Sequence, residues 1–249
     1  MRAGVPQIKA LRALTRDGWI LFGTRFLRLF GYGLISVVLV LYLADLKLSD
    51  TEIGALLSLT LIGDTIVSLW ITTRADRLGR RKMLIFGSLL MVMGGVTFAL
   101  TQSFTLLLIA ATVAVISPSG GEVGPFLSIE QASLSHLIAK DRRTDVFAWY
   151  NLTGSVATAF GALAGGLSVD AARQWGLSNI ASYRPALLTY AVIGGVLGLV
   201  FTSLSSAIEI SNNKETLPRN HGLLLGIKIV YDLLLWRAFA THAPDEELQ

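Results

Sequence analysis

The stretch RADRLGRRK, residues 74–82, carries five basic side chains and one acid between two apolar segments. A charge run of this kind is usually a solvated face, and Lys and Arg gather on the cytoplasmic side of membrane proteins. The acid and the glycine need a further reason. Asp76 is suited to attract helix N-termini or to pair with arginines, Gly79 allows a sharp chain reversal, and Arg80 can make bidentate bonds to a carboxylate. We interpret residues 74–82 as a tight cytoplasmic link between two membrane helices.

The composition of the whole chain also indicates a membrane protein. Of its 249 residues, 53% are hydrophobic and only 15% are charged, whereas soluble domains have about 25% charged residues. The chain has no cysteine, and its three histidines (His136, His221 and His242) lack ligand spacing. We therefore expect no metal site and no cofactor. The net charge of +4 fits cytoplasmic loops better than a nucleic-acid partner.

Six stretches are long and apolar enough to cross a bilayer, which takes about 20 residues. They span residues 19–43, 53–73, 83–100, 104–138, 146–169 and 185–205. The fourth stretch is too long for one straight crossing. Its segment ISPSGGEVGPF, residues 116–126, holds two prolines and three glycines, which would break or kink a helix. Since backbone groups in lipid must be satisfied within each segment, we expect an all-α, polytopic membrane protein with six transmembrane helices.

Lys and Arg also predict the orientation of the chain. With the N-terminus inside, the cytoplasmic segments hold twelve basic residues and the opposite loops hold three. The positive-inside rule then makes residues 1–18 a cytoplasmic segment, residues 19–205 the bundle and residues 206–221 a cytoplasmic linker.

The last part of the chain, residues 222–249, is an amphipathic or seventh helix and a tail. Within GLLLGIKIVYDLLLWRAFA, residues 222–240, Lys228 and Asp232 lie near the middle. The cost of burying these charges roughly cancels the gain from the apolar residues. The two charges are four residues apart and can pair on one face. We favour a helix lying in the membrane interface over a seventh crossing.

The link at residues 74–82 resembles the loop signature of the major facilitator superfamily, G-x-x-x-D-R-x-G-R-[RK]. The leading glycine is replaced by Thr72. The link also falls where that signature belongs, between the second and third of six helices and on the inner side. The resemblance covers about residues 15–210, and the matching residues are Asp76, Arg77, Gly79, Arg80 and Arg81.

This resemblance implies a fold of twelve helices in two six-helix halves, with substrate bound between the halves. The chain would be the N-terminal half of a secondary transporter that moves a small solute by alternating access in a plasma or inner membrane, and not an enzyme. Asp76 and Arg80 would belong to a cytoplasmic latch, and we assign Glu130 as the partner of the arginine. A homodimer mate or a separate half-transporter would replace the missing half. The alternative is a non-transporting membrane fragment or partner-binding module that arises from truncation, splicing or a gene-model error.

Ionisable residues inside the spans mark functional sites by default. At about 1.5 Å per residue, Arg28 lies about 13 Å and Asp64 about 15 Å from the inner end. They can meet either as a structural ion pair or as one that opens on proton or substrate binding. Arg25 is expected to snorkel to the inner surface. Glu122, in the break of the fourth stretch, is either a proton-coupling or cation-binding site or a solvated residue at the outer mouth.

The fifth stretch carries small residues at spacings that let helices approach closely. It only partly resembles the superfamily's glycine-rich antiporter motif, because the usual Gly-Pro is missing, and we infer no antiport from it. The candidate packing residues are Gly154, Gly161, Gly165 and Gly166.

Overall fold

The computed structural model describes residues 11, 14–122 and 124–209, which all lie in the compact unit Met1–Ile210. All regular elements among these residues are helices, so the all-α fold is confirmed. They are α2 (Arg16–Asp45), α3 (Asp50–Leu78), α4 (Arg80–Leu100), α5 (Phe104–Val113), α6 (Phe126–Leu137), α7 (Arg143–Gln174) and α8 (Asn179–Thr202), with 3-10 turns η1 (Lys140–Arg142) and η2 (Ser206–Ile208). The expectations for residues 222–249, and for most of residues 1–18 and 206–221, lie outside the described residues.

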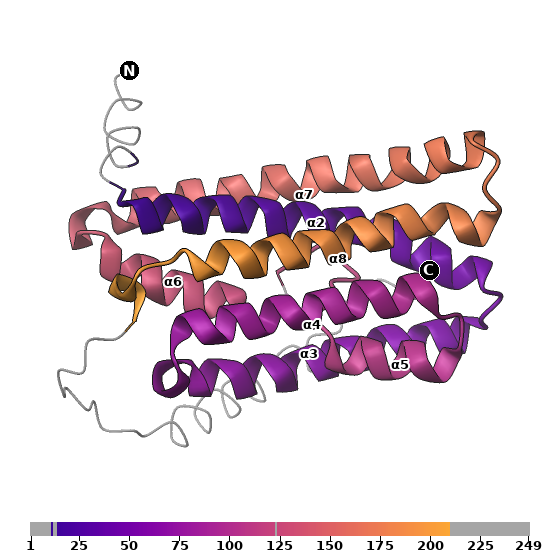
Figure 1. Cartoon of the computed structure of the whole chain (residues 1–249), viewed down its shortest axis with the longest axis horizontal. Coiled ribbons are helices and arrows are strands. Elements are labelled where there is room, and N and C mark those ends of the chain that lie inside the picture. Colours follow the sequence, from indigo (N-terminus) through magenta and orange to yellow (C-terminus); the bar gives the residue numbers. More distant parts are fainter. Residues whose placement is uncertain (1–10, 12–13, 123, 210–249) are drawn as a thin grey trace, which may run out of the picture. The chain divides into compact units, whose positions relative to one another are not determined.

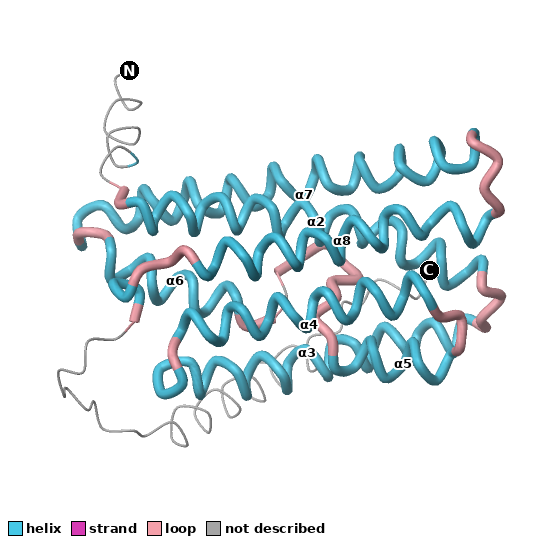
Figure 2. The backbone as a smooth tube through the Cα atoms, viewed as in Figure 1, coloured by secondary structure: helices cyan, strands magenta, loops and turns pink. Residues whose placement is uncertain are grey.

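The described helices include five that are long and apolar enough to cross a membrane: α2, α3, α4, α7 with its preceding turn η1, and α8. The fourth predicted stretch is divided between α5, with 10 residues, and α6, with 12 residues. At about 1.5 Å per residue each is about 15–18 Å long, too short for a hydrocarbon core of about 30 Å. The predicted break is therefore confirmed, and the described residues between the two helices form the loop in the middle of the bundle (Figure 2).

The long helices run side by side, and α5 and α6 lie at opposite ends of the bundle (Figure 1). Helix α2 packs most extensively against α7 and also against α8. Helix α4 packs against α8, and α3 packs against α5. Because α2 lies between α7 and α8, polar side chains along it are enclosed by protein rather than by lipid.

Two helix pairs touch backbone to backbone through a glycine on one helix and a threonine on the other. A Cβ at Gly33 of α2 would lie 2.1 Å from the carbonyl oxygen of Thr158 on α7. A Cβ at Gly63 of α3 would lie 1.9 Å from the carbonyl oxygen of Thr112 on α5. Small residues permit such close crossings, so both interhelical distances depend on the absence of a side chain.

The predicted small-residue contacts of α7 are found at three of the four glycines. A Cβ at Gly154 would meet Arg25 Nε at 2.9 Å, and a Cβ at Gly161 would meet the Phe30 oxygen at 2.0 Å. Gly165 lies similarly close to α2. No such contact is found at Gly166, where a Cβ would meet no described heavy atom within 4 Å. The reason is helical geometry, because Gly166 follows Gly165 by about 100° around the helix and faces away from α2.

Helices α3 and α4 are joined through a single residue, Gly79. Its φ of 101° is a backbone conformation that side-chain-bearing residues rarely adopt. The amide of Gly79 still closes the last turn of α3 by bonding the carbonyl of Ala75 at 2.9 Å. The sharp reversal predicted from the sequence is therefore confirmed.

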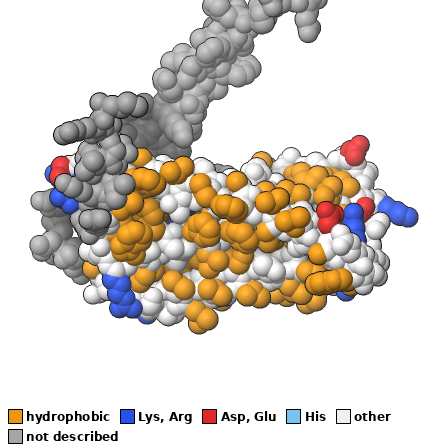
Figure 3. Space-filling view, turned by 90° about the horizontal axis from the view of Figure 1, so that it is seen from above, with side chains coloured by type: hydrophobic (Ala, Val, Ile, Leu, Met, Phe, Trp, Pro, Cys, Tyr) orange, Lys and Arg blue, Asp and Glu red, His pale blue; other side chains and the backbone are white. Residues whose placement is uncertain are grey.

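Large apolar side chains cover the outside of the bundle. Leu199 is 72% exposed, and Ile66 and Val192 are each 63% exposed. Figure 3 shows such side chains spread along the helices, with charged side chains gathered at the two ends of the described part. Soluble monomers rarely expose apolar patches of this extent, and this surface is suited to lipid.

Candidate functional site

Two arginines of α2, Arg25 and Arg28, lie inside the bundle. Their exposed fractions are 6% and 0%. They are three residues apart and so project from the same side of the helix. A buried cation must be compensated by hydrogen bonds and opposite charges, so the groups around these guanidiniums define the candidate site.

Arg28 binds two carboxylates. Its Nη1 and Nη2 donate to the two oxygens of Glu130 at 2.7 and 2.8 Å, and Nη2 also donates to Glu122 at 2.6 Å. The guanidinium lies 4.7 Å from the centre of the Phe126 ring. Its Nε is buried with no hydrogen-bond partner among the described residues. The expected meeting of Arg28 with Asp64 is not found.

Arg25 does not snorkel to the inner surface, as the sequence led us to expect. Its Nη1 lies 3.0 Å from Glu122 Oε2, and its Nε donates to the carbonyl of Tyr150 at 2.9 Å. Its Nη2 donates to the side chain of Asn151 at 3.3 Å. Tyr150 and Asn151 belong to α7. The absence of a side chain at Gly154 lets the backbone of α7 lie directly against Arg25. The Nη1 group makes an ion pair with Glu122 but no hydrogen bond among the described residues, so contacts inside the bundle replace most, but not all, of the solvation at the surface.

The two glutamates differ in their access to solvent. Glu130 is fully buried and also accepts hydrogen bonds from the hydroxyls of Tyr150 and Thr24. The side chain of Glu122 is 17% exposed and comes from the loop between α5 and α6 rather than from a helix. Glu130 therefore holds Arg28 in the protein interior, whereas Glu122 links both arginines to the exterior.

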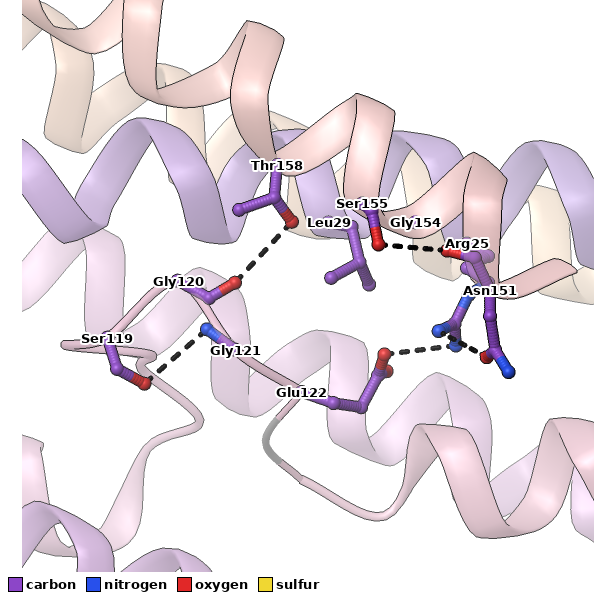
Figure 4. A pocket seen from close by; sticks show the side chains of 10 residues that line it. All are labelled: Arg25, Leu29, Ser119, Gly120, Gly121, Glu122, Asn151, Gly154, Ser155 and Thr158. Atoms are coloured by element: carbon purple, nitrogen blue, oxygen red, sulfur yellow. Dashed lines mark hydrogen bonds and ion pairs between the residues drawn. The ribbon is translucent and has the colours of Figure 1, made fainter. Parts of the chain in front are cut away.

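A cavity of about 550 Å³ opens beside this cluster (Figure 4). Its lining is mainly small and polar, and Leu29 is its one large aliphatic side chain. Pockets of about 300–1,000 Å³ are the usual size for small-molecule sites. The cavity is lined by Arg25, Leu29, Ser119, Gly120, Gly121, Glu122, Asn151, Gly154, Ser155 and Thr158.

Glu122 also lines a second cavity, of about 390 Å³, on the side of α3. Asp64 lies in this cavity, where its Oδ1 accepts hydrogen bonds from the amide of Gly124 at 2.7 Å and from Ser68 at 3.4 Å. Hydroxyl groups of Thr65, Thr72 and Ser128 contribute to the same wall. Asp64 thus shares a cavity with Glu122, and Glu122 stands between the two cavities.

The link at residues 74–82 also contacts the segment that follows α8. Arg80 bonds Asp76 at 3.2 Å and the carbonyl of Ile208 at 3.2 Å. Glu209 accepts from the backbone amides of Arg80 and Arg81 at 2.8 and 3.2 Å. A carboxylate at the start of α4 satisfies free amides and complements the helix dipole. Glu209 was not predicted, because it carries no local signal in the sequence beyond its place just after the sixth stretch.

A family model described as Major Facilitator Superfamily matches residues 21–243. The chain belongs to the major facilitator superfamily. It is 38% identical over 206 residues to the uncharacterized membrane protein YJR124C of Saccharomyces cerevisiae, an alignment that covers 82% of this chain and 46% of the relative. It is 30% identical over 130 residues to the quinolone resistance protein NorA of Staphylococcus aureus strain MRSA252, covering 51% of this chain and 33% of the relative. The aligned segments therefore cover less than half the length of these relatives.

Membership of the superfamily, together with the five apolar helices, establishes an integral membrane protein. The superfamily signature is present at the link between α3 and α4, but one contact expected from it is not. Glu130 binds Arg28 instead of Arg80. Glu130 lies seven residues from the C-terminal end of α6, about 10 Å at 1.5 Å per residue, whereas Arg80 is the first residue of α4. The difference in depth explains why Arg80 pairs with Asp76 and Ile208.

The remaining signature residues and the polar network add two observations. Arg77 is exposed on the last turn of α3. Asn151, which the sequence shows only as part of an N-x-T triplet, lines the cavity and binds Arg25. Among the described residues, no group of three or more His, Asp and Glu side chains is placed to hold a metal ion.

Proposed function

We propose that this chain is one half of a secondary transporter, which moves a small polar solute across a membrane by alternating access and is not an enzyme. The observation that carries the proposal is the cavity that reaches Arg25 and Glu122 inside the bundle. Charges at membrane depth are costly and are retained mainly where a pathway or a coupled ion needs them. Arg25 and Arg28 are the tenth and thirteenth of the 30 residues of α2, so they lie well away from both ends of this helix.

The second half of the transport cavity must come from outside the described bundle. Exposed polar side chains such as Asn151, Ser155 and Thr65 line the two cavities, and polar groups facing lipid are unfavourable. The curated relatives are more than twice as long as the aligned segments. We propose that a second half, a homodimer mate or a separate half-transporter covers these groups.

The proposal assigns the link at residues 74–82 to the cytoplasmic side, with the N-terminus on that side too, in a plasma or inner membrane. Asp76 and Arg80 are proposed to latch the cytoplasmic ends of the helices in the outward-open state. The hydrogen bonds from the amides of Arg80 and Arg81 to Glu209 support a role for the link at residues 74–82 in joining the start of α4 to the segment after α8. Proton coupling is proposed for Glu122, and its 17% exposed side chain is accessible for it.

The name of the S. aureus relative refers to quinolone resistance. It supports transport of a small molecule by this chain, but the aligned half of the chain and the polar lining of the cavity do not favour quinolones in particular. The proposed solute is therefore defined by this cavity: small, polar and able to interact with an arginine and a glutamate.

Cysteine labelling tests alternating access without knowledge of the solute, because the natural chain has no cysteine. The variant Ser155→Cys puts a thiol in the cavity, and Ser203→Cys puts one at the exposed C-terminal end of α8. A membrane-impermeant maleimide is applied to the full chain from either side of sealed vesicles. We expect Ser155→Cys to react from both sides and Ser203→Cys from the cytoplasmic side only. Labelling of Ser155→Cys from one side under every condition would instead support the non-transporting fragment.

A further inference from the structure

Glu122 occupies a position that is built to bind a carboxylate. One of its oxygens lies 2.6 Å from Arg28 Nη2 and the other lies 3.0 Å from Arg25 Nη1. The contact with Arg28 is a charge-assisted hydrogen bond, and the contact with Arg25 is an ion pair without a hydrogen bond. Glu122 belongs to a loop, whereas Arg25 and Arg28 belong to α2. The carboxylate and the two guanidiniums that bind it are therefore not parts of one rigid element.

The charges of the cluster balance only while Glu122 is ionised and in place. Arg28 has its own buried partner in Glu130, with two hydrogen bonds. Among the described residues, Arg25 has no other carboxylate partner, since its remaining bonds go to the neutral Tyr150 carbonyl and the Asn151 amide. Protonation of Glu122 therefore leaves one uncompensated positive charge at the wall of the cavity, and an unpaired charge in the interior is strongly unfavourable.

The cavity next to this position suits the rest of such a solute. Its wall offers the hydroxyls of Ser119, Ser155 and Thr158 and the amide of Asn151, and it has few aliphatic side chains. Ser155 and Thr158 already donate to backbone carbonyls, and hydroxyl and amide groups at these positions have further capacity to pair with hydroxyls of a ligand. A volume of about 550 Å³ is enough for a small hydroxylated acid.

We propose that the solute is a small hydroxylated monocarboxylate, which replaces the Glu122 carboxylate between Arg25 and Arg28 as Glu122 takes up one proton from water. This inference rests on the proposed transport function and names its substrate class. No covalent bond to the solute forms or breaks. One proton binds for each anion, both arginines stay protonated, and the net charge of the cluster is unchanged, so transport of a monocarboxylate together with its proton is electroneutral.

The other ionisable groups around Glu122 come from five helices. Asp64 shares the second cavity with Glu122. The tyrosine hydroxyls and the Arg28–Glu130 pair are buried. The full set comprises Arg25, Arg28 and Tyr32 of α2, Asp64 of α3, Glu130 of α6, Tyr150 of α7 and Tyr190 of α8.

Binding to the purified full chain in lipid nanodiscs tests this exchange independently of transport. The probes are the monocarboxylates acetate, lactate and gluconate, the neutral compounds lactamide and glucose, and the cation choline. We expect the carboxylates to bind, the neutral and cationic probes to bind at least tenfold more weakly, and lactate or gluconate to bind better than acetate. Because one proton is taken up per anion, the affinity should rise about tenfold for each unit of falling pH while Glu122 is ionised in the free protein.

Three variants separate this exchange from a general change in the protein. Glu122→Gln should bind lactate with an affinity that no longer depends on pH, whereas Glu122→Asp should keep the dependence. Arg25→Gln should weaken binding at least tenfold at every pH while Arg28 and Glu130 hold the bundle. Asp170→Asn, an exposed acid on α7, should match the wild type.

Two results would overturn the inference: tighter binding of choline or lactamide than of every carboxylate, or an unchanged pH dependence in Glu122→Gln. If Glu122→Gln does not fold, loss of carboxylate binding in Arg25→Gln supports the inference and retained binding overturns it. Carboxylate binding without two-sided labelling of Ser155→Cys would contradict the proposed transport function but not the proposed class of ligand. Two-sided labelling without carboxylate binding would remove the substrate class alone.

Discussion

Glu130 and Arg28 form a pair with two hydrogen bonds, of 2.7 and 2.8 Å, and neither side chain has exposed surface. The pair joins α6 to α2 across the interior of the bundle. It also sets the electrostatic character of the site, because it leaves Glu122 as the exchangeable partner of Arg25. In this arrangement Glu130 stabilises the bundle through Arg28, whereas Glu122, on its loop, is proposed to bind and release a proton.

Removing the fixed acid should destabilise the bundle. Glu130→Gln removes the fully buried counter-charge of Arg28 and leaves only the more exposed Glu122, and breaking a buried ion pair costs about 3–5 kcal/mol. The free energy of unfolding can be measured by denaturant titration in mixed micelles. Asp141→Asn is the matched control, because the side chain of Asp141 is 74% exposed and exposed pairs contribute about 0–1 kcal/mol. Equal losses for the two variants would show that the buried pair has no special structural role.

Glycine packing on α7 can be tested with one substitution at two positions. Gly161→Ala would place a Cβ 2.0 Å from the carbonyl oxygen of Phe30, which forces α2 and α7 apart and should cost about 1–3 kcal/mol. Gly166→Ala meets no described atom within 4 Å and should be neutral or stabilising by up to about 1 kcal/mol. Thermal unfolding of both variants in lipid compares them directly. Similar losses at the two positions would contradict the packing described here.

The latch proposal concerns conformation more than stability. Asp76→Asn removes the ion pair with Arg80, whose acid is 59% exposed, so the unfolding free energy should change by less than about 1 kcal/mol. Membrane insertion should be normal, but transport should fall severalfold, as should labelling of a Ser155→Cys thiol from the outer side. Unchanged uptake and labelling at normal expression would remove the latch role.

Glu209 is expected to stabilise the start of α4. Glu209→Ala frees the amides of Arg80 and Arg81 and removes a negative charge from the helix N-terminus, which should cost about 1 kcal/mol. Amide hydrogen exchange should accelerate at residues 80 and 81 and stay unchanged in the middle of α2. Equal protection of these amides in the variant and the wild type would show that other groups satisfy them.

Several features of the fold were predictable from the sequence because they depend on hydropathy and on single residues. Long apolar runs predict the helices, Pro118 and Pro125 predict the break between α5 and α6, and Gly79 predicts the reversal before α4. The signature around Asp76 and Arg80 predicts the family. Each of these signals is local, so no knowledge of tertiary packing is needed to use it.

The pairings inside the bundle could not be predicted in the same way. Depth along a helix follows from residue counting, but Arg28 and Asp64 lie at similar depth without meeting, because α2 packs on α7 and α8 whereas α3 packs on α5. The rotation of α2 turns Arg25 toward α7, where Tyr150 and Asn151 bind it. Which helices are neighbours, and which faces they present, depends on contacts distributed over the whole bundle.

The central claim is that Glu122 exchanges places with a solute anion as it takes up a proton. The most direct measurement is the initial rate of uptake of the best-binding carboxylate across pH 5–8, in vesicles from cells that express the full chain with wild-type Glu122 or with Glu122→Gln. The account predicts uptake that rises as the pH falls in the wild type and a flat profile in the variant. The same pH profile in both, or uptake no greater than in vesicles without the protein, would contradict it.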